Sequence, residues 1–129
     1  MVLVFHSLSD VPAIFSGIVP FIAQAYFAGK PRWTPEQMPD QSGRTIIITG
    51  GNSGIGKECA KILLQRNANV YLACRNQDSA ESAIIELREL TGKQAKYLHL
   101  DLANLESVKA AAEEFMSKES RLHVLLNNA

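Results

Sequence analysis

The feature that most constrains this fold is a glycine-rich stretch, residues 49–56, which separates two segments of different periodicity. The β-branched run at 45–48 predicts a buried strand, and the apolar spacing that follows the glycines predicts a helix. Glycines at 50, 54 and 56 let the backbone turn sharply and approach a ligand closely. The free N–H groups and the dipole of the new helix favour negative charge, so this turn predicts a site for an anionic group such as a pyrophosphate.

The loop can be compared with three known glycine patterns of nucleotide-binding proteins. The pattern G-x-G-x-x-G does not fit, because Asn52 stands where a glycine is required. The P-loop pattern G-x-x-x-x-G-K-[ST] nearly fits, but Glu58 stands where a Mg²⁺-binding hydroxyl is needed, and a carboxylate there would face the phosphates. The pattern T-G-x-x-x-G-x-G fits at every fixed position from Thr49 to Gly56. We therefore favour a nicotinamide dinucleotide as the ligand.

A second apolar run, residues 69–74, ends at Arg75, about 20 residues past the glycines, where a nucleotide-binding βαβ unit reads the adenosine ribose. An acidic residue there would bind a 2′-hydroxyl and repel a 2′-phosphate. The planar guanidinium does the opposite, so Arg75 favours NADP over NAD. The alternative is a solvated arginine at the end of a strand.

Two further apolar runs extend the pattern. Residues 95–100 lead to Asp101 and Leu102, and residues 123–126 lead to an Asn-Asn-Ala sequence at 127–129. In this order, the motifs from residue 42 to residue 129 resemble the short-chain dehydrogenase/reductase family in its single-domain form. The stretches Thr-Gly-Gly-Asn-Ser-Gly-Ile-Gly-Lys-Glu and Ala-Cys-Arg are similar to the retinol dehydrogenase-like branch.

The resemblance implies the cofactor-binding part of an NADP-dependent oxidoreductase that acts on small alcohol, aldehyde or ketone substrates by hydride transfer. It also implies which segments contact the cofactor: the glycine-rich loop, the arginine, an Asp-Leu pair that touches the adenine ring, and the Asn-Asn-Ala sequence. The expected cofactor-binding residues are Gly50, Asn52, Ser53, Gly54, Ile55, Gly56, Arg75, Asp101, Leu102, Asn127 and Ala129.

The catalytic serine and Tyr-x-x-x-Lys helix of the family lie downstream of its Asn-Asn-Ala-Gly motif. The one Tyr-x-x-x-Lys spacing in this sequence, Tyr26 to Lys30, lies upstream of the nucleotide fold, where it cannot reach a nicotinamide. We therefore assign no catalytic residue, and expect a half-domain that is truncated at its C-terminal end and inactive as this fragment. The alternative is a non-catalytic nucleotide-binding or regulatory module that occurs naturally as a truncated product.

From residue 41 onward, short apolar runs alternate with helical spacing, which predicts an α/β fold: a partial, Rossmann-type doubly wound parallel sheet. Right-handed crossovers give the strand order 3-2-1-4, with the cofactor over the carboxyl ends of strands 1 and 4. Gly92 is placed to end the second helix and Asn104 to begin the third. The helix residues expected to face the sheet are Ile55, Cys59, Ile62 and Leu63, then Ala80, Ala83, Ile84 and Leu87, then Leu105, Val108, Ala112 and Phe115.

Composition excludes several classes of function. The chain is 47% hydrophobic and 20% charged with zero formal net charge, which is typical of a globular domain and shows no basic bias toward nucleic acid. The two cysteines, Cys59 and Cys74, have neither metal-ligand nor disulfide-framework spacing, so we expect reduced thiols and no metal site.

Because the fourth strand would form an open sheet edge, we expect self-association.

Residues 1–40 are expected to form an apolar arm and a proline-containing linker before the nucleotide-binding half-domain at 41–129. Residues 11–28 hold no charge and approach the length of a spanning helix, but two prolines and a glutamine weaken that prediction. No Lys or Arg precedes them, so a signal peptide is poorly supported. Three alternatives for this segment stay open: an interfacial helix, a leader that packs on the catalytic domain, or an arm that binds a partner. We predict a cytoplasmic location, or membrane association through 11–28 with the domain facing the cytosol.

Overall fold

The computed structural model describes residues 33–129. The chain divides into two units, Met1–Thr34 and Pro35–Ala129, and the second is the nucleotide-binding domain described below. The predictions about residues 11–28, and the Tyr26 to Lys30 spacing, lie outside the described residues. No helix within residues 33–129 is both long enough and apolar enough to cross a membrane.

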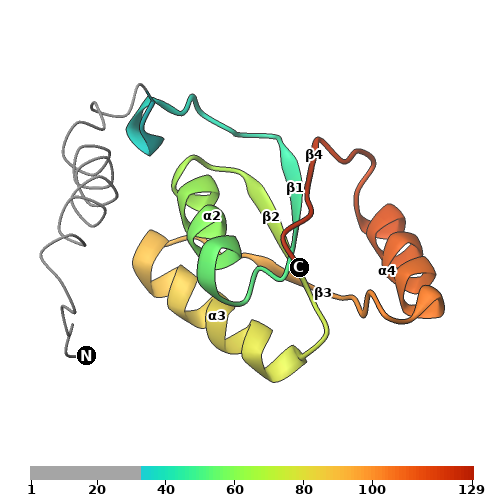
Figure 1. The fold of residues 1–129 in the computed structure, drawn as a ribbon. Helices are drawn as coiled ribbons and strands as arrows, with labels where there is room; N and C mark the ends of the chain where they lie inside the picture. The colour runs from blue at the N-terminus through green and yellow to red at the C-terminus, as the bar shows by residue number, and fades with distance from the viewer. Residues whose placement is uncertain (1–32) are drawn as a thin grey trace, which may run out of the picture. The chain divides into compact units, whose positions relative to one another are not determined.

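A four-stranded parallel sheet forms the centre of the domain (Figure 1). Its strands are β1 (Thr45–Thr49), β2 (Asn69–Cys74), β3 (Lys96–His99) and β4 (Val124–Leu126). They lie in the order β3-β2-β1-β4, which confirms the predicted order 3-2-1-4 and the Rossmann-type fold. In register, Ile48 of β1 lies beside Leu72 on one side and Leu126 on the other, so the strands end at a common edge.

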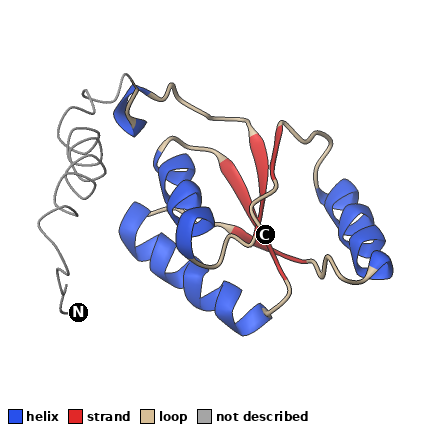
Figure 2. Ribbon diagram, in the orientation of Figure 1, coloured by secondary structure: helices blue, strands red, loops and turns tan. Residues whose placement is uncertain are grey.

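Helices cover both faces of this sheet (Figure 2). The helices α2 (Gly54–Gln65) and α3 (Gln77–Thr91) lie on one face, and α4 (Leu105–Lys118) lies on the other. A short 3-10 helix, η2 (Pro35–Gln37), precedes the sheet. Two of the predicted boundaries are confirmed: Gly92 ends α3 in the left-handed conformation with φ 69°, and the Asn104 side chain caps the first turn of α4.

Each face of the sheet packs its own core, because side chains alternate along a strand. Ile46 and Ile48 pack beneath α2 and α3, whereas Ile47, between them, packs beneath α4. The ring of Tyr71 meets that of Phe115 edge to face, with centroids 5.3 Å apart. The central strands β1 and β2 are buried on both faces, which explains why residues 45–48 and 69–74 read as continuous apolar runs rather than alternating ones.

The predicted inner faces of two helices were only partly correct. Leu63 of α2 and Phe115 of α4 are buried as predicted, and Cys59 packs against the core. In α2 the buried positions are Gly56, Ala60, Leu63 and Leu64, and Ile55 is 77% exposed. In α4 they are Ala111 and Phe115, with Leu105 84% exposed and Ala112 also exposed. Small residues, Gly56 and Ala60 in α2 and Ala111 in α4, are thus buried together with the larger apolar side chains. The prediction for α3 was correct at all four of its positions.

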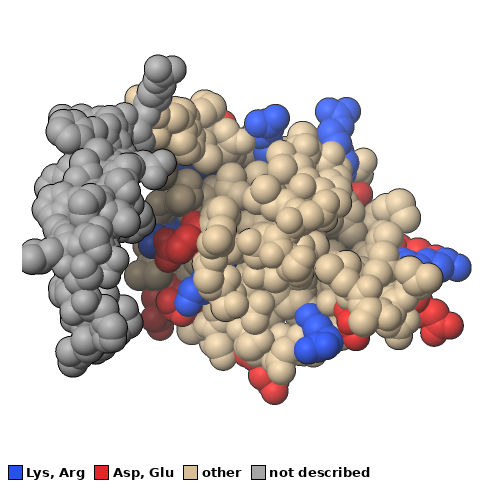
Figure 3. Space-filling view, in the orientation of Figure 1, with Lys and Arg blue, Asp and Glu red and all other residues tan. Residues whose placement is uncertain are grey.

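Charged side chains are distributed over the domain surface. On the face drawn in Figure 3, Lys and Arg lie interspersed with Asp and Glu around the rim, in keeping with the zero formal net charge. The ion pairs are mostly local, such as Lys61 with Glu58 and Lys118 with Glu114 on single helices. Exposed pairs of this kind add little to stability.

Candidate nucleotide-binding site

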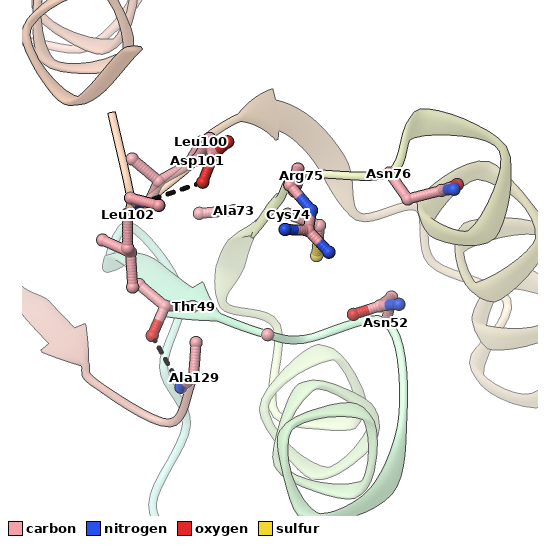
Figure 4. Close-up of a pocket in the computed structure, with 12 residues that line it drawn as sticks. Thr49, Asn52, Ala73, Cys74, Arg75, Asn76, Leu100, Asp101, Leu102 and Ala129 are labelled. Carbon is pink, nitrogen blue, oxygen red and sulfur yellow. Dashed lines mark hydrogen bonds between the residues drawn. The ribbon is translucent and has the colours of Figure 1, made fainter. Parts of the chain in front are cut away.

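A pocket of ≈ 660 Å³ opens at the carboxyl ends of the strands, where the chain leaves β1, β2, β3 and β4 (Figure 4). In that view Arg75, Asn76 and Asn52 lie on one side, and Asp101 and Leu102 on the other. This edge of a doubly wound sheet, where the strand order reverses, is where such folds bind ligands. The residues that line the pocket are Thr49, Gly50, Asn52, Ala73, Cys74, Arg75, Asn76, Leu100, Asp101, Leu102, Ala103 and Ala129.

The glycine-rich loop connects β1 to α2 and adopts backbone conformations that favour glycine. Gly50 and Gly54 have φ values of 62° and 53°, in the left-handed region. Gly56 is required for space instead: a Cβ atom there would lie 2.6 Å from the carbonyl oxygen of Gly50 and 2.7 Å from Nδ2 of Asn128. The sequence pattern therefore corresponds to two different steric demands within one turn.

The first turn of α2 presents backbone N–H groups that the helix itself does not use. Ser53 occupies the N-cap position with φ −154° and ψ 168°, and its side chain makes no capping hydrogen bond. The first turn holds no acidic residue that would repel an anion. The Nζ atom of Lys57 binds the Glu86 carboxylate at 2.8 Å, so this lysine is turned toward α3. Lys57 does not take the phosphate-binding position that the P-loop reading requires.

Two residues absent from the predicted list hold the end of β4 against the loop. Thr49 Oγ1 accepts hydrogen bonds from the backbone N–H of Asn128 at 2.9 Å and of Ala129 at 3.1 Å. In return, Asn128 Nδ2 donates to the carbonyl oxygens of Thr49 at 3.2 Å and Gly50 at 3.3 Å. A threonine at the end of the first strand and a second asparagine after the fourth were the available signal, since these strands were predicted to be neighbours.

Arg75 lines the pocket directly after β2 and is exposed. Within residues 33–129 its guanidinium has no hydrogen bond and no ion pair, so its donors are available to a ligand. The neighbouring Cys74 thiol is buried, which raises its pKa and keeps it neutral. This wall of the pocket therefore carries one uncompensated positive charge.

The opposite wall combines a polar turn with an apolar side chain. The Asp101 carboxylate accepts a hydrogen bond from the Ala103 N–H at 3.0 Å, while the Asp101 N–H donates to Ser107 Oγ at 2.9 Å. These bonds hold the turn between β3 and α4. Leu102 is 55% exposed beside it and offers an apolar surface of the kind that a flat aromatic ring can contact.

The structure brings most, but not all, of the predicted cofactor-binding residues to the pocket. Those that line it are Gly50, Asn52, Arg75, Asp101, Leu102 and Ala129. Those that lie at the start of α2 without lining it are Ser53, Gly54, Ile55 and Gly56. Asn127 is exposed and does not line it. Among the described residues, no cluster of His, Cys, Asp or Glu side chains could hold a metal ion, and both cysteines are free thiols.

Comparison with known proteins agrees with this geometry. A family model described as short chain dehydrogenase matches residues 44–129. The chain is 50% identical over 113 residues to a short-chain dehydrogenase/reductase of Armillaria gallica, covering 88% of this chain and 37% of that protein. It is 49% identical over 126 residues to retinol dehydrogenase 11 of Mus musculus, covering 97% and 39%. This chain thus spans less than two fifths of the length of these relatives.

Solved structures give the same result. A short chain dehydrogenase from Shigella flexneri, complexed with NADP, shares 31% identity and superposes with a TM-score of 0.64 over 69% of this chain and 38% of that one. The L-sorbose reductase of Gluconobacter frateurii, complexed with NADPH and L-sorbose, shares 32% identity with a TM-score of 0.63, over 70% and 34%.

Proposed function

Because this chain belongs to the short-chain dehydrogenase family, we propose that its domain binds NADP at the pocket described above and is the cofactor-binding part of an oxidoreductase for alcohol or carbonyl substrates. The observation that carries this proposal is the free guanidinium of Arg75, which lines the same pocket as the glycine-rich loop. Two anion-binding features that are independent in sequence thus serve one site. The NADP and NADPH complexes of two structural relatives support the same choice of cofactor.

The residues divide the proposed ligand between them according to their chemistry. The N–H groups at the start of α2 suit the pyrophosphate, because this helix end carries partial positive charge. The Arg75 guanidinium suits a 2′-phosphate on the adenosine ribose, and Leu102 with Asp101 suits the adenine ring. Gly50 and Ala129 lie where β1 and β4 end, on the way to the nicotinamide. When bound, the nicotinamide would supply the hydride.

We further infer that this chain by itself performs no turnover. Neither tyrosine among the described residues offers its hydroxyl to the pocket. Tyr71 donates to the Glu119 carboxylate, and Tyr97 donates to the carbonyl oxygen of Cys74. We propose small alcohols, aldehydes or ketones as the substrate class. For the location we propose the cytoplasm; the alternative is membrane association through residues 11–28, with the domain facing the cytosol.

The alternative is a non-catalytic module that binds nucleotide for regulation. Both readings require nucleotide binding, so they are separated by the sequence that follows residue 129 in the transcript. A continuation with a serine and a Tyr-x-x-x-Lys pair would support the enzyme. A stop codon at that point would support the module.

The proposed cofactor preference is tested by titrating NADPH and NADH into the wild-type chain and into Arg75→Asp. A charge-assisted contact to phosphate contributes ~1.5–3 kcal/mol, so NADPH binding should weaken by roughly one to two orders of magnitude while NADH binding changes little. Lys93→Asp, an exposed change of the same charge beyond the opposite end of α3, serves as the control. An unchanged ratio of the two affinities in Arg75→Asp would contradict the assignment.

A further inference from the structure

One hydrogen bond joins the glycine-rich loop to the beginning of α3, and two more hold its acceptor residue there. Asn52 Nδ2 donates to the Ser79 hydroxyl at 3.0 Å. That hydroxyl donates to the carbonyl oxygen of Asn76 at 3.2 Å, and the Ser79 N–H donates to Asn76 Oδ1 at 2.9 Å. Asn52 and Asn76 line the pocket, whereas Ser79 lies behind them and does not. One side chain therefore connects two residues of the pocket wall that come from different loops.

This connection is made at the part of the loop with the least intrinsic order. Gly50 and Gly51 precede Asn52, and Gly54 follows it in the left-handed conformation. Because glycine loses more backbone entropy on ordering than other residues, this loop is costly to hold in one conformation. The backbone of Gly50 is already held by Ala73 and Asn128. Asn52 is the next residue whose side chain is held, and its partner is Ser79.

We propose that Ser79 is a positioning residue for nucleotide binding, an inference that rests on the function proposed above. The Ser79 hydroxyl holds Asn52 against the start of α3. The N-cap residue of this helix, Asn76, directly follows Arg75 in the sequence. The loop amides and the backbone that carries Arg75 are thereby ordered for two phosphate groups of one ligand before that ligand arrives. Preordering of this kind raises affinity because less conformational entropy is lost when the ligand binds.

Ser79→Ala tests this role cleanly. The substitution removes the hydroxyl but keeps the N–H that donates to Asn76, so α3 retains its N-terminal cap. Ser79→Thr keeps the hydroxyl and should restore the wild-type behaviour. Ser82→Ala is the matched control, because the Ser82 hydroxyl donates within α3 to the carbonyl oxygen of Asp78 at 2.9 Å and does not contact the loop.

Two measurements on the full 129-residue chain give independent readouts. Amide hydrogen exchange without nucleotide should show faster exchange over the loop in Ser79→Ala than in Ser82→Ala, while the exchange of β1 and β2 stays unchanged. Titration with NADPH should show a dissociation constant raised about two- to twelvefold in Ser79→Ala, the range that loss of one neutral hydrogen bond corresponds to.

The outcomes separate this inference from the proposed function. If the wild-type chain binds NADPH and Ser79→Ala matches Ser82→Ala in both measurements, the positioning role is wrong and the proposed function stands. If Ser79→Ala loosens every strand as well as the loop, Ser79 is merely structural and the inference is also wrong. If the wild-type chain does not bind NADPH, the proposed function fails and this inference fails with it, whatever the exchange data show.

Discussion

Gly56 makes the sharpest steric prediction at the scale of single residues. A side chain there meets the carbonyl oxygen of Gly50 and the amide of Asn128 at distances that real Cβ atoms do not adopt. We expect Gly56→Val to push the loop away from the end of β4, abolish NADPH binding and cost about 1–3 kcal/mol of stability, as overpacking typically does. Thermal unfolding and nucleotide titration check both effects.

Gln65→Ala, an exposed change at the other end of α2, is the control for Gly56→Val. A folded Gly56→Val protein that binds NADPH like the wild type would mean that this glycine merely permits a turn.

Which residues of the site could be predicted depended on how far their partners lie along the chain. Gly50 and Arg75 were recognised because a turn and a strand end are local features of the sequence. Thr49 was recognised as part of the glycine pattern, but its bonds to residues 128 and 129 were not predicted, because these partners lie 79 and 80 residues away. Ser79 was missed for the same reason, since its bond to Asn52 spans 27 residues and no spacing rule connects them.

At the scale of elements, the end of α4 is fastened to the sheet by one carboxylate. Glu119, which follows α4, accepts hydrogen bonds from Lys96 at 2.9 Å, Tyr71 at 2.7 Å and Asn69 at 2.8 Å. These bonds, that from Lys96 foremost, lower the pKa of Glu119 to about 2 from an ordinary value of 4.5. The unfolded chain therefore binds more protons between these pH values, and stability rises with pH there.

We expect Glu119→Gln to lower the free energy of unfolding by about 1–2 kcal/mol at neutral pH, because charge-assisted hydrogen bonds are lost. The difference from wild type should be full above pH 4.5 and shrink as the pH falls toward 2. Urea unfolding across this range measures it. Glu113→Gln, on the exposed side of α4, should show little change at any pH. A constant difference down to the lowest pH would show that the charge of Glu119 is not the cause.

The elements themselves were predictable, but the inner faces of α2 and α4 were predicted only in part. Leu63 and Phe115 are buried as expected, whereas Ile55 and Leu105 are exposed. Periodicity identified an apolar face for each helix, yet α2 turns Gly56 and Ala60 toward the sheet and leaves Ile55 outside. Hydrophobicity counts isoleucine as a core residue, whereas close packing against a loop favours the smallest side chain. The pattern for α3 succeeded because its buried residues are the apolar ones that recur at helical spacing.

At the scale of the whole molecule, one edge of the sheet exposes apolar surface. Within residues 33–129, β4 pairs with β1 alone, and Leu125 in its centre is 50% exposed. A pocket of ≈ 420 Å³ with mostly apolar walls lies beside it, between β4 and α4. Open edges of this kind recruit other chains, so we expect self-association of this chain through β4.

Leu125→Lys should shift this chain toward the monomer, as measured by sedimentation velocity, because a charge on an edge strand opposes pairing. Leu90→Lys, which changes a leucine of similar exposure on α3, should leave the association unchanged. Equal association of both variants and the wild type would place the contact elsewhere.

Within residues 33–129, no tyrosine hydroxyl faces the pocket as a proton donor for hydride transfer. Hydride transfer needs an oriented carbonyl and a proton donor beside the nicotinamide. Positioning contributes ~7–11 kcal/mol to such reactions and general acid catalysis ~10²–10⁴-fold. In the described residues, the hydroxyls of Tyr71 and Tyr97 are bonded away from the pocket. We therefore expect NADPH to bind without being oxidised over a panel of aldehydes and ketones. Turnover by this chain that is lost in Tyr71→Phe, Tyr97→Phe or Tyr26→Phe would show that the replaced tyrosine reaches the substrate, and would contradict this prediction.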